Sequence, residues 1–191
     1  MSALPESAEG SAPGDDVITT ERYKDLLAQL AGAVAVITTR DAEALNWGFT
    51  ASSFCSLSLE PPLVLFCLSH DADCAAAFAA TGNFAVSILT ARQVELSQRF
   101  AGKGDAKYAG VRFATGALGM PLLPGALVWL ECRVVARYPG GDHTIVVGQV
   151  ERGDMAPADG DGGGAGPLLY YDRGYGAFTT GEGVTDDGNG R

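Results

Sequence analysis

Apolar and polar residues alternate along this 191-residue chain with the periods of both helices and strands. Between Tyr23 and Leu30, apolar residues recur at i, i+3, i+4 and i+7, a spacing that places them on one helix face. Thr19 or Thr20 can cap this helix at its start, because a threonine hydroxyl accepts a bond from an early backbone N–H. Gly32 is expected to end it.

Most of the remaining apolar runs are short, β-branched and bounded by turn residues, which is typical of strands. A serine-rich segment continues one of these strands from residue 51 to Leu59, and Pro61 and Pro62 then break it, since neither can donate to a sheet ladder. The fully apolar run 63–68 is expected in the middle of a sheet. Seven main strands are predicted, with a short one near 112–113: 33–39, 46–59, 63–68, 84–89, 127–138, 143–152 and 168–171.

Two further helices are predicted, an alanine-rich one over 71–80 and another over 92–100 that Thr90 can cap. Strands mostly follow strands directly, without crossover helices between them. This order argues against a doubly wound parallel sheet and predicts a mainly β fold, an antiparallel barrel with helices packed outside it.

The length fits one domain, which we place at residues 17–178. Residues 1–16 and 179–191 are acidic, rich in small residues and expected to be disordered, and 159–167 reads as a flexible loop. The N-terminus does not resemble a signal peptide and no apolar stretch is long enough for a membrane span, so we expect a cytoplasmic protein.

Charge is unevenly distributed. The net charge is −10, but residues 1–16, 153–167 and 179–191 hold ten of the 23 acidic residues and one of the 13 basic ones. The folded body is therefore nearly neutral, and binding to nucleic acid or an anionic membrane is not expected. One local basic surplus, which could meet an anionic cofactor or simply form a solvated surface, comprises Arg92, Arg99, Lys103, Lys107 and Arg112.

The sequence shows no metal-binding or dinucleotide motif. Its four cysteines form no C-x-x-C pair and are expected to be small, reduced, buried residues, so no metal is predicted. Thiol chemistry at Cys55 is an alternative, although no base lies near it in the motif. No glycine-rich stretch has the G-x-G-x-x-G or P-loop pattern, and D-G-D-G at 159–162 lacks the glutamate of a calcium loop.

Small hydroxyl residues are concentrated in T-A-S-S-F-C-S at 50–56. Such residues leave backbone N–H groups and side-chain oxygens free to face a ligand, although serine and threonine also alternate along many half-exposed strands. A second short motif, G-D-H-T, lies at 141–144, where His143 follows a turn. A lone histidine beside a turn is commonly a surface residue, and its neighbours alone do not decide between that role and a functional one.

Together with R-F-A-G at 99–102, these motifs resemble the short-chain flavin reductase family, over residues 23–175. The resemblance implies a split β-barrel homodimer that reduces FMN or FAD with NADH or NADPH. It also implies that the reduced flavin passes to a separate monooxygenase.

The resemblance implies a role for each matching residue. His143 would orient the nicotinamide or donate a hydrogen bond near the reacting rings, and Tyr175 would lie beside the flavin. The family often has a basic or amide residue where this chain has His70 and Asp71, which shifts the expected phosphate contact onto Ser56, Arg99 and the backbone. The implied cofactor-binding residues are Thr50, Ala51, Ser52, Ser53, Ser56, Cys67, Leu68, Ser69, Arg99, Phe100, Ala101 and Tyr175.

Two alternatives remain open on the same barrel: a flavin-binding electron-transfer module, and a flavin-dependent oxidoreductase with its own organic substrate. The sequence does not choose between FMN and FAD or between NADH and NADPH, since no ribose-reading residue can be located outside a Rossmann unit.

Overall fold

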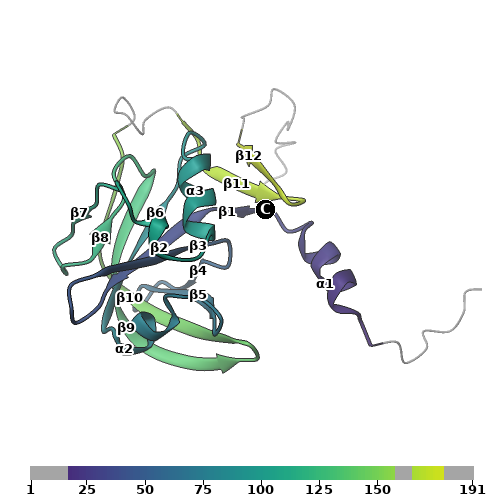
Figure 1. The fold of residues 1–191 in the computed structure, drawn as a ribbon, viewed down its shortest axis with the longest axis horizontal. Helices are drawn as coiled ribbons and strands as arrows, with labels where there is room; N and C mark the ends of the chain where they lie inside the picture. The colour runs from purple at the N-terminus through teal and green to yellow at the C-terminus, as the bar shows by residue number, and fades with distance from the viewer. Residues whose placement is uncertain (1–16, 158–164, 179–191) are drawn as a thin grey trace, which may run out of the picture.

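A computed structural model describes residues 17–157 and 165–178 of the chain (Figure 1). The two predicted tails, 1–16 and 179–191, lie outside the described residues, as does most of the predicted loop 159–167.

Strands dominate the described chain. Three α-helices and a short 3₁₀ helix accompany them: α1 (Thr20–Leu27), α2 (Ala75–Ala80), α3 (Val94–Ala101) and η1 (Asp105–Lys107). The strands are β1 (Gly32–Ala33), β2 (Ala35–Arg40), β3 (Asn46–Ala51), β4 (Cys55–Ser58), β5 (Leu63–Ser69), β6 (Asn83–Ile88), β7 (Ala114–Thr115), β8 (Pro121–Leu122), β9 (Val128–Gly140), β10 (His143–Met155), β11 (Leu168–Tyr171) and β12 (Gly174–Ala177).

The strands form a seven-stranded antiparallel sheet in the order β3-β2-β6-β9-β10-β5-β4, a three-stranded sheet β1-β11-β12 and a small pair β7-β8. The large sheet curls so that α2 and α3 lie outside it, while β11 and β12 pack beside β1 (Figure 1). The predicted antiparallel barrel with flanking helices is confirmed.

The apolar run 63–68 was predicted to lie in the middle of a sheet. It lies instead one strand from the edge. Burial alternates along β5: Val64, Phe66 and Leu68 are buried, whereas the residues between them are half-exposed. An apolar run on both faces normally indicates that both faces are covered. Here the outer face of β5 is only partly covered within the described chain, a point that bears on assembly below.

The serine-rich segment is also divided. The structure ends β3 at Ala51 and begins β4 at Cys55, so the predicted continuous strand 46–59 is wrong and residues 52–54 form a connection. The short strand expected near 112–113 begins later, at Ala114, and the ring of Phe113 just before it packs against Phe100.

Helix starts were predicted with mixed success. Thr19 caps α1 as expected, accepting a bond from the N–H of Arg22 at 3.2 Å. In contrast, α2 begins at Ala75 and α3 at Val94 after the N-cap Gln93, so both predicted starts were early. Thr90 does not cap α3; its N–H donates to the side chain of Gln93, which is the N-cap residue.

The core is built around four phenylalanine rings from three strands and α2. Phe66 contacts Phe49, Phe78 and Phe84 with ring centroids 5.0 to 5.8 Å apart. Gly148 on β10 completes this packing, since a Cβ atom there would lie 2.4 Å from the Phe84 ring. In the described ranges, no helix is long and apolar enough to cross a membrane.

Candidate functional site

The hydroxyl residues lie where β3 ends and the chain turns toward β4. Thr50 is half-buried, and its Oγ1 donates to the backbone carbonyl of Ser97 on α3 at 2.6 Å. Ala51 points into the core, whereas Ser52 and Ser53 are exposed. Ser56 is exposed on β4 opposite Val64. The segment is therefore open to a ligand at its two central serines.

A cavity of about 160 Å³ lies between the end of β3, helix α3 and the strands β11 and β12. We call it the β3–α3 cavity. It is lined by Val34, Thr50, Ser52, Ser97, Ala101, Tyr170 and Tyr175. Four of these seven residues, Thr50, Ser52, Ala101 and Tyr175, were predicted to bind cofactor, and the fold brings them together around one cavity. Val34, Ser97 and Tyr170 were not predicted.

Tyr175 is held in this cavity by a hydrogen bond of 3.0 Å between its hydroxyl and Ser97 Oγ. Its ring also packs edge-on against Tyr170 at a centroid distance of 5.3 Å. Ser97 was missed because a serine within a helix carries no ligand pattern. The sequence held one signal for Ser97: it lies four residues before Ala101, a predicted cofactor-binding residue, and positions i and i+4 share a helix face.

Ser53 connects this cavity to the neighbouring strand. Its Oγ donates to the carbonyl of Cys67 and accepts from the N–H of Cys67, both at 3.2 Å. Cys67 and Ser69 share the outer face of β5, and Ser69 lies directly opposite His143 on β10. A polar row therefore runs from Ser52 through Ser53 and Ser69 to His143.

His143 is 40% exposed at its side chain, and its Nδ1 lies 2.7 Å from Asp142 Oδ1. This hydrogen bond lowers the pKa of Asp142 from its ordinary value, because it stabilises the carboxylate. Asp142 thereby fixes the ring through one nitrogen and leaves the other for a ligand.

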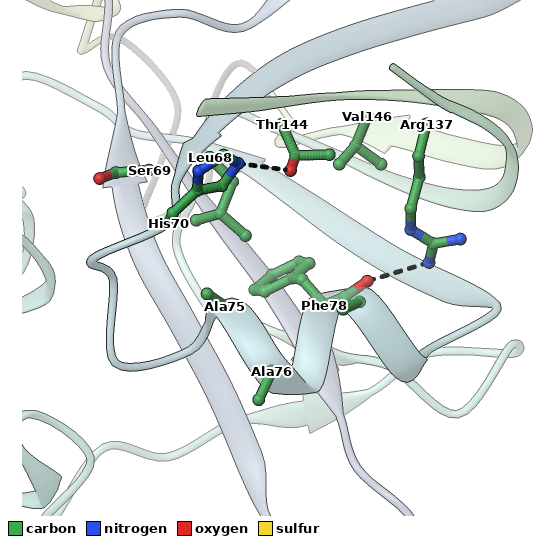
Figure 2. A pocket seen from close by; sticks show the side chains of 10 residues that line it. Leu68, Ser69, His70, Ala75, Ala76, Phe78, Arg137, Thr144 and Val146 are labelled. Atoms are coloured by element: carbon green, nitrogen blue, oxygen red, sulfur yellow. Dashed lines mark hydrogen bonds between the residues drawn. The ribbon is translucent and has the colours of Figure 1, made fainter. Parts of the chain in front are cut away.

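The opposite face of β5 lines a different cavity, of about 320 Å³, beneath α2 (Figure 2). There His70 Nε2 lies 3.2 Å from Thr144 Oγ1, and Arg137 donates to the carbonyl of Phe78 at 2.9 Å. The buried Leu68 points toward Phe78, while the Ser69 hydroxyl points away (Figure 2). Leu68 is therefore placed apart from the polar row, and only its backbone can reach a ligand there.

Arg99 and Phe100 were expected near the flavin phosphate, but both side chains make contacts within the chain. Arg99 donates to the carbonyls of Ala106 and Ala109, which ties α3 to the following loop. Phe100 is 1% exposed and packs against Tyr108 and Phe113.

All four cysteines are free thiols, but not all are buried as expected. Cys55 is exposed on β4 and Cys67 is half-exposed on β5. Burial raises the pKa of Cys74 to about 11 and that of Cys132 to about 12, so both remain protonated. Over residues 17–157 and 165–178, no three metal-ligating side chains cluster.

Comparison with known proteins identifies the fold's relatives. Residues 27–179 match the family described as flavin reductase like domain. The chain is 38% identical over 154 residues to the reductase subunit HsaB of a flavin-dependent monooxygenase from Mycobacterium tuberculosis, covering 81% of this chain and 80% of HsaB. It is 37% identical to an NADH:riboflavin 5'-phosphate oxidoreductase from Streptomyces pristinaespiralis, covering 85% of this chain and 90% of that protein.

Among solved structures, the chain superimposes on the NADH:FAD oxidoreductase SgcE6 from Streptomyces globisporus, solved with NAD and FAD fragments, with a TM-score of 0.77. The two are 31% identical, and the match covers 92% of this chain and 99% of SgcE6. The family resemblance and the split-barrel fold predicted from the sequence are thus confirmed, and the chain belongs to the flavin reductase family.

Proposed function

We propose that this protein is a flavin reductase that uses NADH to reduce FMN or FAD and releases the reduced flavin to a separate monooxygenase. The observation that carries this proposal is the polar row from Ser52 to His143, which begins at the β3–α3 cavity. Relatives of this chain act as reductase components that serve a distinct oxygenase.

The exposed hydroxyls fit a flavin ring. Ser52 presents its hydroxyl group at the cavity, and the exposed Ser53 beside it presents backbone, so both can bond the polar edge of an isoalloxazine. The aromatic side chains of Tyr170 and Tyr175 and the apolar Val34 offer flat and apolar contacts on the other side.

His143 has the position to orient the second substrate. It lies at the other end of the row, opposite Ser69, with one ring nitrogen held by Asp142. From there it can donate to the nicotinamide carboxamide and hold that ring over the flavin. Flavin and nicotinamide supply the hydride chemistry between nicotinamide C4 and flavin N5, and the chain's residues bind, align and shield them.

The active species is proposed to be a homodimer. Helix α1 has no buried residue and projects from the barrel (Figure 1). It nevertheless carries the exposed apolar side chains of Tyr23, Leu26 and Leu27, and Leu30 is exposed just after it. The outer face of β5 also carries two partly exposed apolar side chains, Leu63 and Leu65. Two such surfaces in one chain are most simply covered by a second copy. Sedimentation should show a dimer, and Leu26→Glu should dissociate it while Lys24→Glu on the polar face should not.

The enzymatic proposal is tested by a steady-state assay that crosses NADH and NADPH with FMN and FAD. NADH should be consumed only when flavin is added. A yellow protein that retains flavin through dialysis without turnover would instead establish an electron-transfer module. A cytoplasmic location is part of the proposal, since NADH and reduced thiols both belong to that compartment.

A further inference from the structure

One buried serine on α3 connects the two walls of the β3–α3 cavity. Ser97 is fully buried and lines the cavity together with Thr50 of β3 and Tyr175 of β12. It bonds both of them, one through its backbone and the other through its side chain. We propose that Ser97 is a positioning residue, which holds the Tyr175 hydroxyl where it can meet a bound flavin; this inference rests on the proposed function.

The side chains of Ser97 and Tyr175 form a hydroxyl pair. Ser97 Oγ and the Tyr175 hydroxyl oxygen lie 3.0 Å apart, and either atom can be the donor. Each hydroxyl has one proton, so the bond between them uses one proton of the two. The second proton can be donated to a ligand in either case, because both residues line the cavity. The pair therefore offers one O–H donor, and the carbonyl oxygens of an isoalloxazine are acceptors for it.

The backbone of Ser97 fixes the opposite wall. The Thr50 hydroxyl donates to the Ser97 carbonyl at 2.6 Å, which joins β3 to α3. The proton of Thr50 is thereby used inside the chain and is not available to a ligand. Donation from this part of the cavity wall therefore falls to the pair that Ser97 forms with Tyr175.

Tyr175 depends on Ser97 for the direction of its hydroxyl. β12 is the edge strand of the small sheet β1-β11-β12, and Tyr175 is half-buried there. Its ring packs edge-on against Tyr170, with centroids 5.3 Å apart, but this contact gives the hydroxyl no partner. Ser97 supplies the partner from a helix that is itself packed against β3. The donor is thus aimed before a flavin arrives, and less order must be gained on binding.

A second buried serine provides a matched control. Ser87 on β6 is also fully buried, and its Oγ accepts from the N–H of Leu123 at 3.2 Å. It does not line the β3–α3 cavity. Ser87→Ala leaves that N–H without its acceptor, so it should lower the urea midpoint but leave flavin affinity unchanged. A hydroxyl that only supports the fold is expected to behave in this way.

The test measures dissociation constants for FMN by fluorescence quenching, without NADH. Ser97→Ala and Tyr175→Phe should each weaken binding about tenfold, the value of one hydrogen bond. Because the two hydroxyls act as a pair, the double variant should bind about as well as either single variant, instead of about a hundredfold more weakly than wild type. Ser97→Cys nearly keeps the volume of the side chain but is a weak donor, and it should resemble Ser97→Ala.

Steady-state kinetics separate positioning from damage to the fold. In Ser97→Ala, the KM for FMN should rise, while kcat at saturating FMN stays within about twofold of wild type. An unchanged dissociation constant in Ser97→Ala, or losses that add in the double variant, would overturn the role of Ser97 and leave flavin reduction intact. If FMN binding depended on Ser97 as expected but wild type oxidised no NADH, the proposed function alone would be overturned.

Discussion

Glu131 and His143 are polar side chains on the neighbouring strands β9 and β10, but their surroundings differ completely. Glu131 is fully buried, and its carboxylate accepts from the N–H groups of Ala117 and Leu118, both at 2.8 Å. His143 is partly exposed and bonds only the exposed Asp142. The comparison teaches that a polar group whose bonds are completed inside the chain maintains the fold, whereas one with an open bond can serve a ligand.

The largest effect is expected at Glu131. Glu131→Ala leaves two backbone N–H groups without an acceptor and should lower the free energy of unfolding by about 3 kcal/mol. Urea denaturation measures the loss. Glu151→Ala, which breaks the partly exposed pair with Arg133, should cost less than about 1 kcal/mol. Equal losses in both variants would show that Glu131 has no special structural role.

Ser52→Trp should have the next largest effect, on flavin binding instead of stability. The indole would occupy the mouth of the β3–α3 cavity and weaken flavin binding about a hundredfold. Because Ser52 is exposed, the melting temperature should hardly change. Ala80→Trp places the same side chain at the exposed end of α2 as a control. Full flavin affinity in Ser52→Trp would exclude this cavity as the binding site.

His143→Ala should lower kcat about tenfold, equivalent to about 1.4 kcal/mol, with little change in flavin affinity or stability. The matched control is His70→Ala, because His70 lies on the other face of β5 beside Thr144 (Figure 2). Its kcat should stay within about twofold of wild type. If the two variants had the same kcat, the face of the sheet that carries His143 would have no special role in catalysis.

The smallest effect is a pH dependence at Asp73, which bonds the buried Lys107 at 2.7 Å. Burial raises the pKa of Asp73, but bonds from Lys107 and Gly104 outweigh it, so the pKa lies below its ordinary value of about 3.9. The stabilisation is therefore present above about pH 4 and is lost as the pH falls through the lowered pKa. Urea midpoints at neutral and acid pH should differ more in wild type than in Asp73→Asn. The same acid sensitivity in both proteins would contradict this assignment.

Local patterns predicted local structure well. The period of the apolar residues and the hydroxyl of Thr19 are properties of one short segment, and α1 begins where they indicated, although it ends at Leu27 and not at the predicted Gly32. The position of β5 in the sheet depends on its pairing with β4 on one side and with β10, which is distant in sequence, on the other. No pattern within 63–68 reveals which strands it pairs with.

The candidate site follows the same division between local patterns and the assembled fold. The serine run and His143 could be recognised from their motifs, and the fold places them in one row. Motifs do not reveal which side chains the fold itself uses. Phe100 is in the core, Arg99 bonds loop carbonyls, and Ser97 gained its position in the cavity only when α3 packed on β3.

The most direct test of the whole account is anaerobic stopped-flow mixing of the protein and flavin with NADH deuterated at C4 of the nicotinamide. If the polar row aligns the two rings, flavin should bleach in a single fast phase. Deuterium on one face of C4 should slow that phase, and His143→Ala should slow it further. Bleaching that is no faster than in free solution, or that is unaffected by deuterium on either face, would contradict direct hydride transfer at this site.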